Sequence, residues 1–329
     1  MIEKVYLKMP ECNMEIISDD SKFLKFIRES YYLFLCKKPA KIDLQSKIFL
    51  HRDKNLHKKN TFISPVASMD EESLICKDGP LTVEIKKNPL RFESWIKESK
   101  IKRIAKLIIR GKKRTMSDYY EFLSQRVVRY PLFYYWEQKG FQLHHSATIE
   151  KNGYAYLFIG FNKIGKSTAA LKLSTKGYKI MSDNFSLIKN KKVYPYMRGM
   201  RVTDFVKKRI KDLRLKKLPI EGNKYQVILD KQNFNYSPAK IKKLFFFKRA
   251  GKFRLKKITK DEALEQLMNI SNILDEYYHH HFLSFIPFFT KDKISINRIK
   301  NYKELSKIEA YNVEYSNIED IERIEKLLK

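Results

Sequence analysis

The chain has 329 residues, 43% of them hydrophobic and 13% aromatic, and a formal net charge of +31, so it can build real cores and is not an intrinsically disordered protein. Its three cysteines, Cys12, Cys36 and Cys76, form no C-x-x-C pair, so they indicate neither a disulfide framework nor a zinc site and favour a reducing, cytoplasmic setting. The N-terminus lacks a basic segment followed by an apolar run, and no run of about 18 uncharged apolar residues occurs, so we expect neither a signal peptide nor a membrane span.

The first 125 residues predict a small α+β domain. Residues 4–7 are strand-like, and residues 22–35 carry apolar side chains at helical spacing, which predicts a helix. Residues 81–85 alternate like a half-buried strand, which Pro89 ends. We place the second domain at residues 126–329.

Two helical segments are predicted between residues 92 and 136. Residues 92–110 place Trp95 and later apolar residues at helical spacing, and residues 118–136 continue with an aromatic-rich helix. The other face of the first segment is basic. This face is either solvated or a contact for an acidic partner, and it consists of Lys100, Lys102, Arg103, Lys106 and Arg110.

From His144 onward the pattern changes to strands. Residues 147–150 lead to Asn152-Gly153, a dipeptide typical of tight hairpin turns. The run at residues 154–159 is almost continuously apolar, as in a strand that is buried on both faces of a sheet. A glycine-containing loop follows directly.

This loop matches G-x-x-x-x-G-K-[ST], and it lies between a predicted strand and a predicted helix at residues 168–176. The glycines let backbone N–H groups turn inward and form a cup for phosphate, and the positive end of the helix points at the same place. Lys166 would neutralise β- and γ-phosphate charge, and the Ser167 hydroxyl would hold Mg²⁺. The predicted nucleotide-binding residues are Gly160, Phe161, Asn162, Lys163, Ile164, Gly165, Lys166, Ser167 and Thr168.

A carboxylate follows this loop closely. Gly177 is placed to stop the helix, and residues 178–181 predict a short strand that ends in Ser182-Asp183-Asn184. Asp183 comes 17 residues after Lys166. It is either a metal ligand beside the loop or part of a turn-forming Asp-Asn pair.

These motifs together resemble the HPr kinase/phosphorylase-like kinases, whose fold is related to phosphoenolpyruvate carboxykinase. The shared pattern is a histidine 15 residues before the first loop glycine, a glycine turn, an apolar strand, the loop, a helix ending in glycine and a second strand. This strand ends in Asp-Asp in the family and in Asp183-Asn184 here. It covers residues 130–200. Residues 241–247 and 261–264 resemble a later strand and helix of the family less specifically.

The resemblance implies a catalytic role for His145 near the γ-phosphate, together with Lys166 and Asp183, and a metal site at Ser167 and Asp183. The chain departs from the family at Asn184, where the family has an aspartate that acts as the base toward the acceptor. An amide does not accept this proton at neutral pH. Asp183 or Asp204 would then serve as the base, or the chain binds nucleotide without transferring phosphate.

The family's second glutamate ligand for metal is also missing after residue 190. Arg198 and Arg201 occupy this stretch, as phosphate contacts or as surface charges.

We therefore predict an α/β protein with an HPr kinase-like P-loop domain that acts as an ATP- and Mg²⁺-dependent kinase on a hydroxyl of a protein, peptide or small molecule. A non-catalytic ATP-binding module is the alternative. A nucleic-acid-associated NTPase ranks third, because lysine is spread along the chain and no nucleic-acid fold signature accompanies the basic clusters. The choice between ATP and GTP, the acceptor and a homo-oligomeric state stay open.

Overall fold

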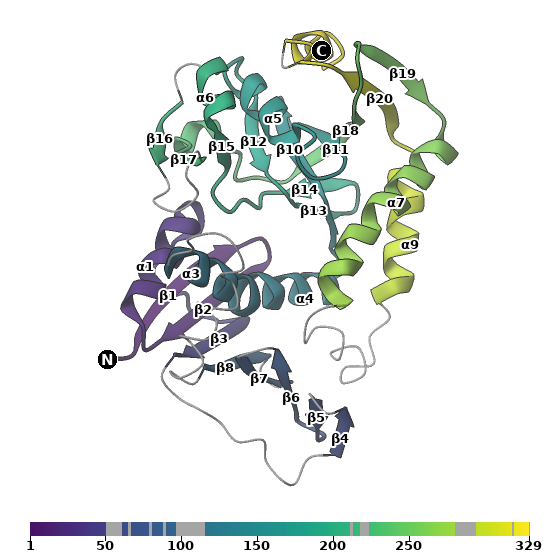
Figure 1. The fold of residues 1–329 in the computed structure, drawn as a ribbon. Coiled ribbons are helices and arrows are strands. Elements are labelled where there is room, and N and C mark those ends of the chain that lie inside the picture. Colours follow the sequence, from purple (N-terminus) through teal and green to yellow (C-terminus); the bar gives the residue numbers. More distant parts are fainter. Residues whose placement is uncertain are drawn as a thin grey trace. The chain divides into compact units, whose positions relative to one another are not determined.

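The computed structural model describes residues 1–50, 61–64, 67–78, 81–87, 90–96, 116–210, 213–217, 224–279, 294–317 and 319–328. They form two compact units (Figure 1). The first comprises Met1–Lys139 and a segment from Tyr278, and the second comprises Gly140–Tyr277 and the chain from Ile294. Both units combine helices with mixed sheets, so the predicted α/β class is confirmed. Within the described residues, no helix is long and apolar enough to cross a membrane.

The first unit contains an eight-stranded sheet in the order β1-β2-β3-β8-β7-β6-β5-β4. The pairs β2–β3 and β3–β8 are parallel, and the other neighbours are antiparallel. The strands predicted at residues 4–7 and 81–85 are confirmed as β1 and β7. The bounds are β1 Glu3–Met9, β2 Cys12–Ser18, β3 Leu44–Phe49, β4 Thr61–Ser64, β5 Ala67–Met69, β6 Ser73–Asp78, β7 Leu81–Lys86 and β8 Arg91–Ile96.

Helix α1 (Ser21–Ser30) begins where the sequence predicts, because the Asp20 side chain accepts hydrogen bonds from the Lys22 and Phe23 backbone N–H groups. It ends five residues before residue 35, and a 3₁₀ turn (Tyr32–Phe34) follows. The aromatic segment predicted at residues 118–136 is helical, as α3 (Met116–Ser124), a π-helical turn (Gln125–Arg129) and α4 (Tyr130–Gln138). The boundary predicted at residue 125 lies within this run, and the second unit starts at Gly140.

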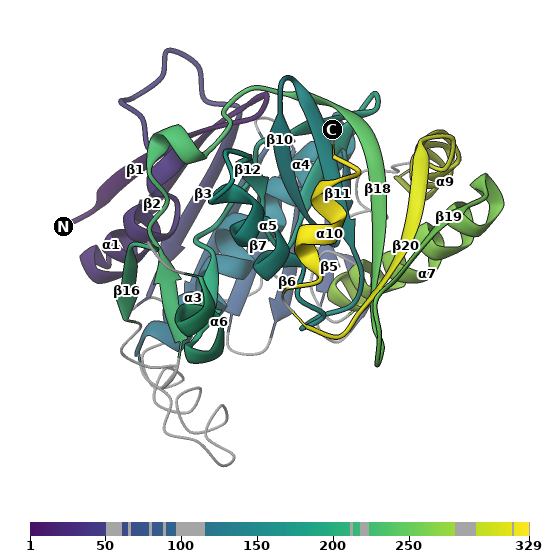
Figure 2. The same ribbon diagram turned by 90° about the horizontal axis from the view of Figure 1, so that it is seen from above.

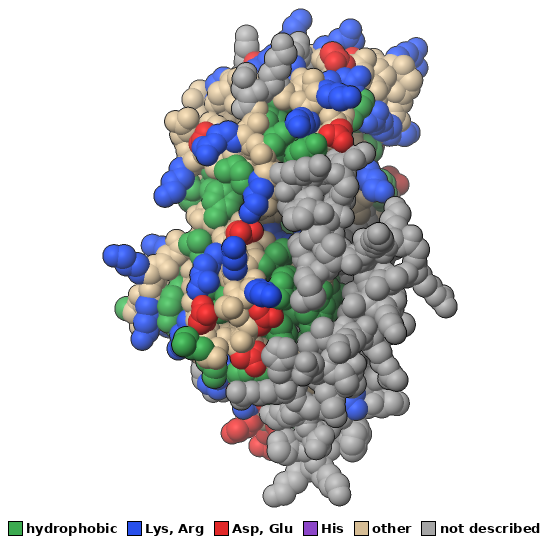
Figure 3. Space-filling model, turned by 60° about the vertical axis from the view of Figure 1, so that its left-hand side comes forward, with side chains coloured by type: hydrophobic (Ala, Val, Ile, Leu, Met, Phe, Trp, Pro, Cys, Tyr) green, Lys and Arg blue, Asp and Glu red, His purple; other side chains and the backbone are tan. Residues whose placement is uncertain are grey.

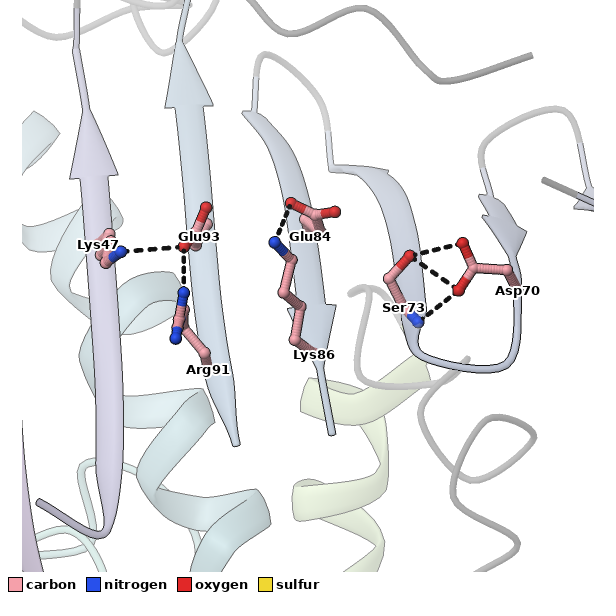
Figure 4. A network of polar contacts seen from close by, with 7 residues as sticks. All are labelled: Lys47, Asp70, Ser73, Glu84, Lys86, Arg91 and Glu93. Carbon is pink, nitrogen blue, oxygen red and sulfur yellow. Dashed lines mark hydrogen bonds and ion pairs between the residues drawn. The ribbon is translucent and has the colours of Figure 1, made fainter. Parts of the chain in front are cut away.

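The helix predicted from residue 92 is wrong over its described part, where the chain forms strand β8. This strand lies between β3 and β7, and its pairing with both outweighs the helical spacing of its apolar residues. Its buried Glu93 forms ion pairs with Lys47 at 3.1 Å and with Arg91 at 3.3 Å (Figure 4). A charged residue can therefore occupy this central strand. The basic face predicted at Lys100 to Arg110 lies outside the described residues.

The second unit is built on a nine-stranded sheet, which carries the predicted loop. Strands β11, β18 and β20 run parallel to one another, and β10 lies antiparallel between β11 and β12. The hairpin predicted at Asn152-Gly153 and the strand at residues 154–159 are confirmed. The bounds are β9 Gln142–His144, β10 Ser146–Lys151, β11 Tyr154–Ile159, β12 Lys179–Ser182, β13 Ser186–Lys189, β14 Lys192–Tyr194, β18 Ala239–Arg249, β19 Arg254–Ile258 and β20 Glu309–Tyr315.

Two pairs of helices cover the two faces of this sheet (Figure 2). Helix α5 (Lys166–Ser174) packs on β10, β11 and β12, and it contacts α10 (Ile321–Glu325) on the same face. Helices α7 (Lys260–His279) and α9 (Ile294–Leu305) cover the other face. The core on that side includes Leu157, Ile159, Leu244, Phe246, Ala263, Leu267, Tyr302 and Leu305.

A three-stranded sheet follows β14 in the chain, in the order β15-β17-β16, with helix α6 against β15. Its elements are β15 Arg201–Thr203, α6 Asp204–Arg209, β16 Leu215–Lys217 and β17 Lys224–Val227. A 3₁₀ turn at Lys231–Asn233 leads on to β18.

Lysine and arginine side chains are scattered over the face drawn in Figure 3 and do not form one continuous patch there. Among the described residues of the whole chain, several lysines and arginines are paired with carboxylates. Lys176 lies 2.6 Å from Glu325, and Arg214 lies 2.6 Å from Asp230. Exposed pairs of this kind stabilise a fold by only about 0–1 kcal/mol each, but they lower the local excess of positive charge.

Candidate functional site

The phosphate-type loop lies at the edge of the second-unit sheet where β11 ends, which we call the loop edge. Strand β10 is antiparallel to β11, with Ser146 opposite Ile159, so β10 begins at this edge. Strand β12 pairs with β10, with Ser182 opposite Thr148, so β12 ends there. The residue before β10 is His145 and the residue after β12 is Asp183. The topology thus gathers the predicted site residues at one edge.

Two glycines let the loop adopt its path. Gly160 has φ +154°, and a Cβ at this position would lie 2.9 Å from the Phe247 carbonyl oxygen of β18. Gly165 has φ +96°, and a Cβ at this position would clash with the Tyr315 hydroxyl of β20. Both positions require glycine for backbone conformation and for space.

Helix α5 starts at Lys166, directly after Gly165, and so two residues earlier than predicted. It ends at Ser174, and Gly177 follows with φ +84° as the predicted stop. Because the helix begins within the motif, the N-terminal N–H groups of α5 belong to residues at and just after Lys166. These groups are unpaired within a helix and attract anions.

Lys166 points back into the loop. Its side chain is buried, and its ammonium group donates hydrogen bonds of 2.8 Å to the Gly160 and Phe161 carbonyl oxygens. Burial lowers the pKa of Lys166 to about 8, and the Asp183 charge acts in the opposite direction. Two backbone carbonyl oxygens of the loop therefore hold the Lys166 ammonium group, and the Asp183 charge favours its protonated form. An anion bound in the loop would replace these two hydrogen bonds with an ion pair to the Lys166 ammonium group.

Ser167 and Asp183 form the next contact. The Ser167 hydroxyl donates a hydrogen bond of 2.5 Å to the Asp183 carboxylate. Burial raises the pKa of Asp183, while the Ser167 hydrogen bond and the Lys166 charge lower it. Among the described residues no three His, Cys, Asp or Glu side chains gather as a metal site. The hydroxyl and carboxylate nevertheless fit Mg²⁺, which prefers one or two protein oxygens completed by phosphates and water.

His145 contacts Asn184, the residue that follows Asp183. Its Nε2 is 3.2 Å from the Asn184 Oδ1, and Asn184 has φ +69°, a conformation that asparagine tolerates. Burial lowers the pKa of His145 to about 4, and the Lys166 charge adds to this effect. The imidazole is therefore neutral at pH 7. With Nε2–H donating to Asn184, Nδ1 is an acceptor, and it makes no well-formed hydrogen bond with the described residues.

Buried hydroxyl groups lie behind these residues. The Ser186 hydroxyl is 2.7 Å from those of Ser146 and Thr148 and 2.6 Å from that of Ser182. Ser146 follows His145 in the chain and Ser182 precedes Asp183. The cluster therefore ties together the strands that carry both residues, in a region where unpaired polar groups are costly.

The remaining predicted residues differ in exposure, and the Asn162 side chain interacts with His145. Phe161, Asn162 and Lys163 are exposed, and Ile164 and Thr168 are partly buried. Arg201 is an exposed residue of β15, and Asp204 begins α6 beside it. Arg198 is partly buried after the bridge that joins Tyr196 to Ser182.

Two residues at the loop edge were not predicted from the sequence. Tyr315 lies against Gly165, and Arg249 lies opposite Tyr315 in the register of β18 and β20. The alternation of Tyr311, Val313 and Tyr315 indicates a strand, but it does not reveal the neighbour of that strand. The strand predicted at residues 241–247 is confirmed within β18, and Arg249 is its last residue.

A scan against protein-family models finds no match, and a search of curated proteins finds no similar sequence.

Proposed function

We propose that the second unit is an HPr kinase-like P-loop domain that binds a nucleoside triphosphate with Mg²⁺ and transfers its γ-phosphoryl group to a hydroxyl. The acceptor is a protein, a peptide or a small molecule. The observation that supports this most is the convergence, at one edge, of a loop-bound lysine, the Ser167–Asp183 pair and a neutral histidine. These are the parts that phosphoryl transfer needs: an anion cup, a metal site and a polar group near the acceptor.

Binding would follow from charge and geometry already present in the loop. The phosphates accept hydrogen bonds from the loop N–H groups and from the first turn of α5, where the helix dipole favours negative charge. Lys166 exchanges its contacts with the Gly160 and Phe161 carbonyl oxygens for phosphate oxygens. Its ammonium group is already oriented, so little side-chain entropy is lost on binding.

Ser167 and Asp183 would hold Mg²⁺. The ion supplies charge neutralisation for the β- and γ-phosphate oxygens when it is bound. Asp183 would provide the negative charge of the site. Burial raises its pKa, and the Ser167 hydrogen bond and the Lys166 charge offset only part of this rise. The residues present thus suit a metal that is shared between protein and nucleotide.

In the transfer step, the acceptor hydroxyl oxygen forms a bond to the γ-phosphorus as the bond to the β,γ-bridging oxygen breaks. The nucleoside diphosphate leaves with that electron pair, and the hydroxyl proton passes to Nδ1 of His145. Asn184 orients the ring through Nε2. The negative γ-phosphate raises the pKa of the imidazole in the complex, which makes the ring a better base there than in the free protein.

Transfer is tested with γ-labelled ATP in a single turnover, with Mg²⁺ and fractions of a cell lysate as acceptors. The proposal expects label in a protein, peptide or small-molecule fraction. If nucleotide binds but no labelled acceptor or phosphate appears in any fraction, the kinase proposal is wrong and binding alone remains.

Asn184 favours one alternative, a non-catalytic module in which nucleotide orders the fold for a partner. An amide orients His145 but does not stabilise the imidazolium that a proton transfer would create. The Asn184→Asp variant distinguishes the two. If the chain is a kinase limited by this amide, the variant should transfer phosphate faster, whereas a non-catalytic module should gain nothing.

A further inference from the structure

The two sides of the loop strand differ in chemistry. On one side lie β10 and β12, which place His145 and Asp183 at the loop edge, and on the other side lie β18 and then β20. If the proposed function holds, the γ-phosphate faces the side of Asp183 and His145. The α-phosphate and the nucleoside must then extend toward β18 and β20.

Strands β18 and β20 reach beyond the end of β11 on this second side. Ile159 is opposite Phe246, so Phe247 and Arg249 lie alongside the loop rather than alongside β11. The Phe247 carbonyl oxygen contacts Gly160, and the Tyr315 hydroxyl contacts Gly165. The phosphate loop therefore has a wall made by the ends of two distant strands.

Side-chain alternation places Arg249 on the helix α5 face of the sheet, as for Phe247, and places Lys248 on the α7 and α9 face. The aromatic contacts agree with this assignment. Phe247 lies 5.2 Å from Phe158 and 5.5 Å from Tyr315 between ring centroids, and Arg249 lies 5.4 Å from the Tyr315 ring. The guanidinium group is thus on the same side of the sheet as the loop.

Arg249 is exposed and has no carboxylate partner among the described residues. Its guanidinium donates a hydrogen bond of 3.3 Å to the Ser316 carbonyl oxygen and lies over the Tyr315 ring. Tyr315 is only 3% exposed, and its hydroxyl has no well-formed hydrogen bond with the described residues. An exposed guanidinium without a carboxylate partner among the described residues and a buried hydroxyl beside it therefore lie next to the loop, where an anion would accept hydrogen bonds from both.

We propose that Arg249 binds the α-phosphate of the nucleotide, with Tyr315 as the positioning residue that holds both Arg249 and the Gly165 turn. This inference rests on the proposed nucleotide binding and adds the orientation of the nucleotide to it. Arginine suits this role because its planar guanidinium can form two parallel hydrogen bonds with phosphate oxygens.

The test is isothermal titration calorimetry with Mg²⁺ and whichever of ATP and GTP the wild type binds more tightly, followed by the two α-phosphorothioate diastereomers of that nucleotide. Arg249→Ala is compared with Lys248→Ala, which removes an equal, adjacent charge from the opposite face. We expect Arg249→Ala to weaken triphosphate binding about tenfold and Lys248→Ala to leave it within about twofold. The wild type should bind one diastereomer more tightly, and Arg249→Ala should lose this preference. Arg249→Lys, which keeps the positive charge, should keep only part of the wild-type affinity for the triphosphate.

Two results would overturn the inference. One is unchanged binding by Arg249→Ala, and the other is weaker binding with the diastereomer preference intact, which would indicate only a distant charge effect. Thermal unfolding of each variant shows whether it is folded, as expected for an exposed position. If the wild type binds neither ATP nor GTP, the proposed function itself fails. If the wild type binds nucleotide and the Arg249→Ala variant binds it equally well, only the inference about Arg249 fails.

Discussion

The Ser167 hydroxyl donates a 2.5 Å hydrogen bond to the Asp183 carboxylate, although 16 residues separate the two in the chain. One residue lies in the first turn of α5 and the other follows the end of β12. The contact exists because α5 returns the chain to the sheet so that β12 ends at the loop edge. The two oxygen atoms that we propose as Mg²⁺ ligands are therefore adjacent in the chain's own structure.

From this hydrogen-bonded pair we expect Asp183→Asn to change triphosphate affinity in a way that depends on Mg²⁺. The amide keeps the size of the side chain but removes the negative charge that attracts Mg²⁺. We expect triphosphate affinity at saturating Mg²⁺ to fall by about tenfold or more, and binding measured without divalent metal to change little. Titration of Mg²⁺ at fixed nucleotide measures this difference. Ser174→Ala, which removes a hydroxyl at the other end of α5, is the control.

An equal loss of affinity by Asp183→Asn with and without Mg²⁺ would contradict a metal role. Asp183 would then act through the loop structure alone.

Because His145 is buried, we expect the free energy of unfolding to fall in acid. Its pKa in the folded protein is about 4 because of burial, whereas the ordinary value is 6.5. Between these pH values the unfolded chain binds more protons, so the free energy of unfolding decreases as the pH falls through this window. The limiting slope is about 1.4 kcal/mol per pH unit for one such group. Urea unfolding from pH 7 to pH 4.5 should show a weaker pH dependence for His145→Gln than for the wild type.

His144 is a neighbouring buried histidine whose pKa burial lowers to about 3, and it contributes to both proteins in that comparison. Lys166, the nearest cation, stays charged throughout the window because its pKa is about 8. The difference between the two curves therefore measures His145 together with its electrostatic effect on His144. Identical pH dependence in both proteins would show that His145 is not buried as a neutral group.

We expect a side chain at position 165 to disturb the loop sterically. Gly165→Ala places a methyl group against the Tyr315 hydroxyl and also strains a residue at φ +96°. Gly177→Ala is the matched control, because Gly177 has φ +84° at the end of the same helix and nothing lies within 4 Å of its Cβ position. Both variants should lose on the order of 1 kcal/mol of stability from backbone strain.

Only Gly165→Ala should also lose triphosphate affinity, by about tenfold or more, because it displaces Tyr315 or the loop. Calorimetric titration and thermal unfolding of both variants separate strain from displacement. Equal affinity in the two variants would mean that Tyr315 does not constrain the loop.

Local features of the sequence predicted the centre of the site. The apolar run of β11, the turn at Asn152-Gly153 and the loop motif are all contiguous, and their structure depends on neighbouring residues. The position of Asp183 beside Ser167 also follows from a short strand after a short helix. These predictions needed no knowledge of distant pairing.

Pairing between strands that are far apart in the sequence accounts for the features that the sequence did not predict. Tyr315 reaches Gly165 only because β20 pairs in parallel with β18, and β18 pairs in parallel with β11. The wrong helix at residue 92 has the same origin, since Phe92 and Trp95 are spaced for a helix but their segment pairs with β3 and β7. Periodicity gives no information on which strands become neighbours.

The central claim is that the loop at the end of β11 binds a nucleoside triphosphate, and Lys166→Ala tests it most directly. Calorimetric titration of ATP and GTP with Mg²⁺ is compared for the wild type, Lys166→Ala and Lys179→Ala, an exposed lysine of β12. We expect the wild type to bind, Lys179→Ala to bind equally, and Lys166→Ala to lose at least about tenfold in affinity while remaining folded. A wild type that binds neither nucleotide, or a Lys166→Ala variant that binds as tightly as the wild type, would contradict the claim.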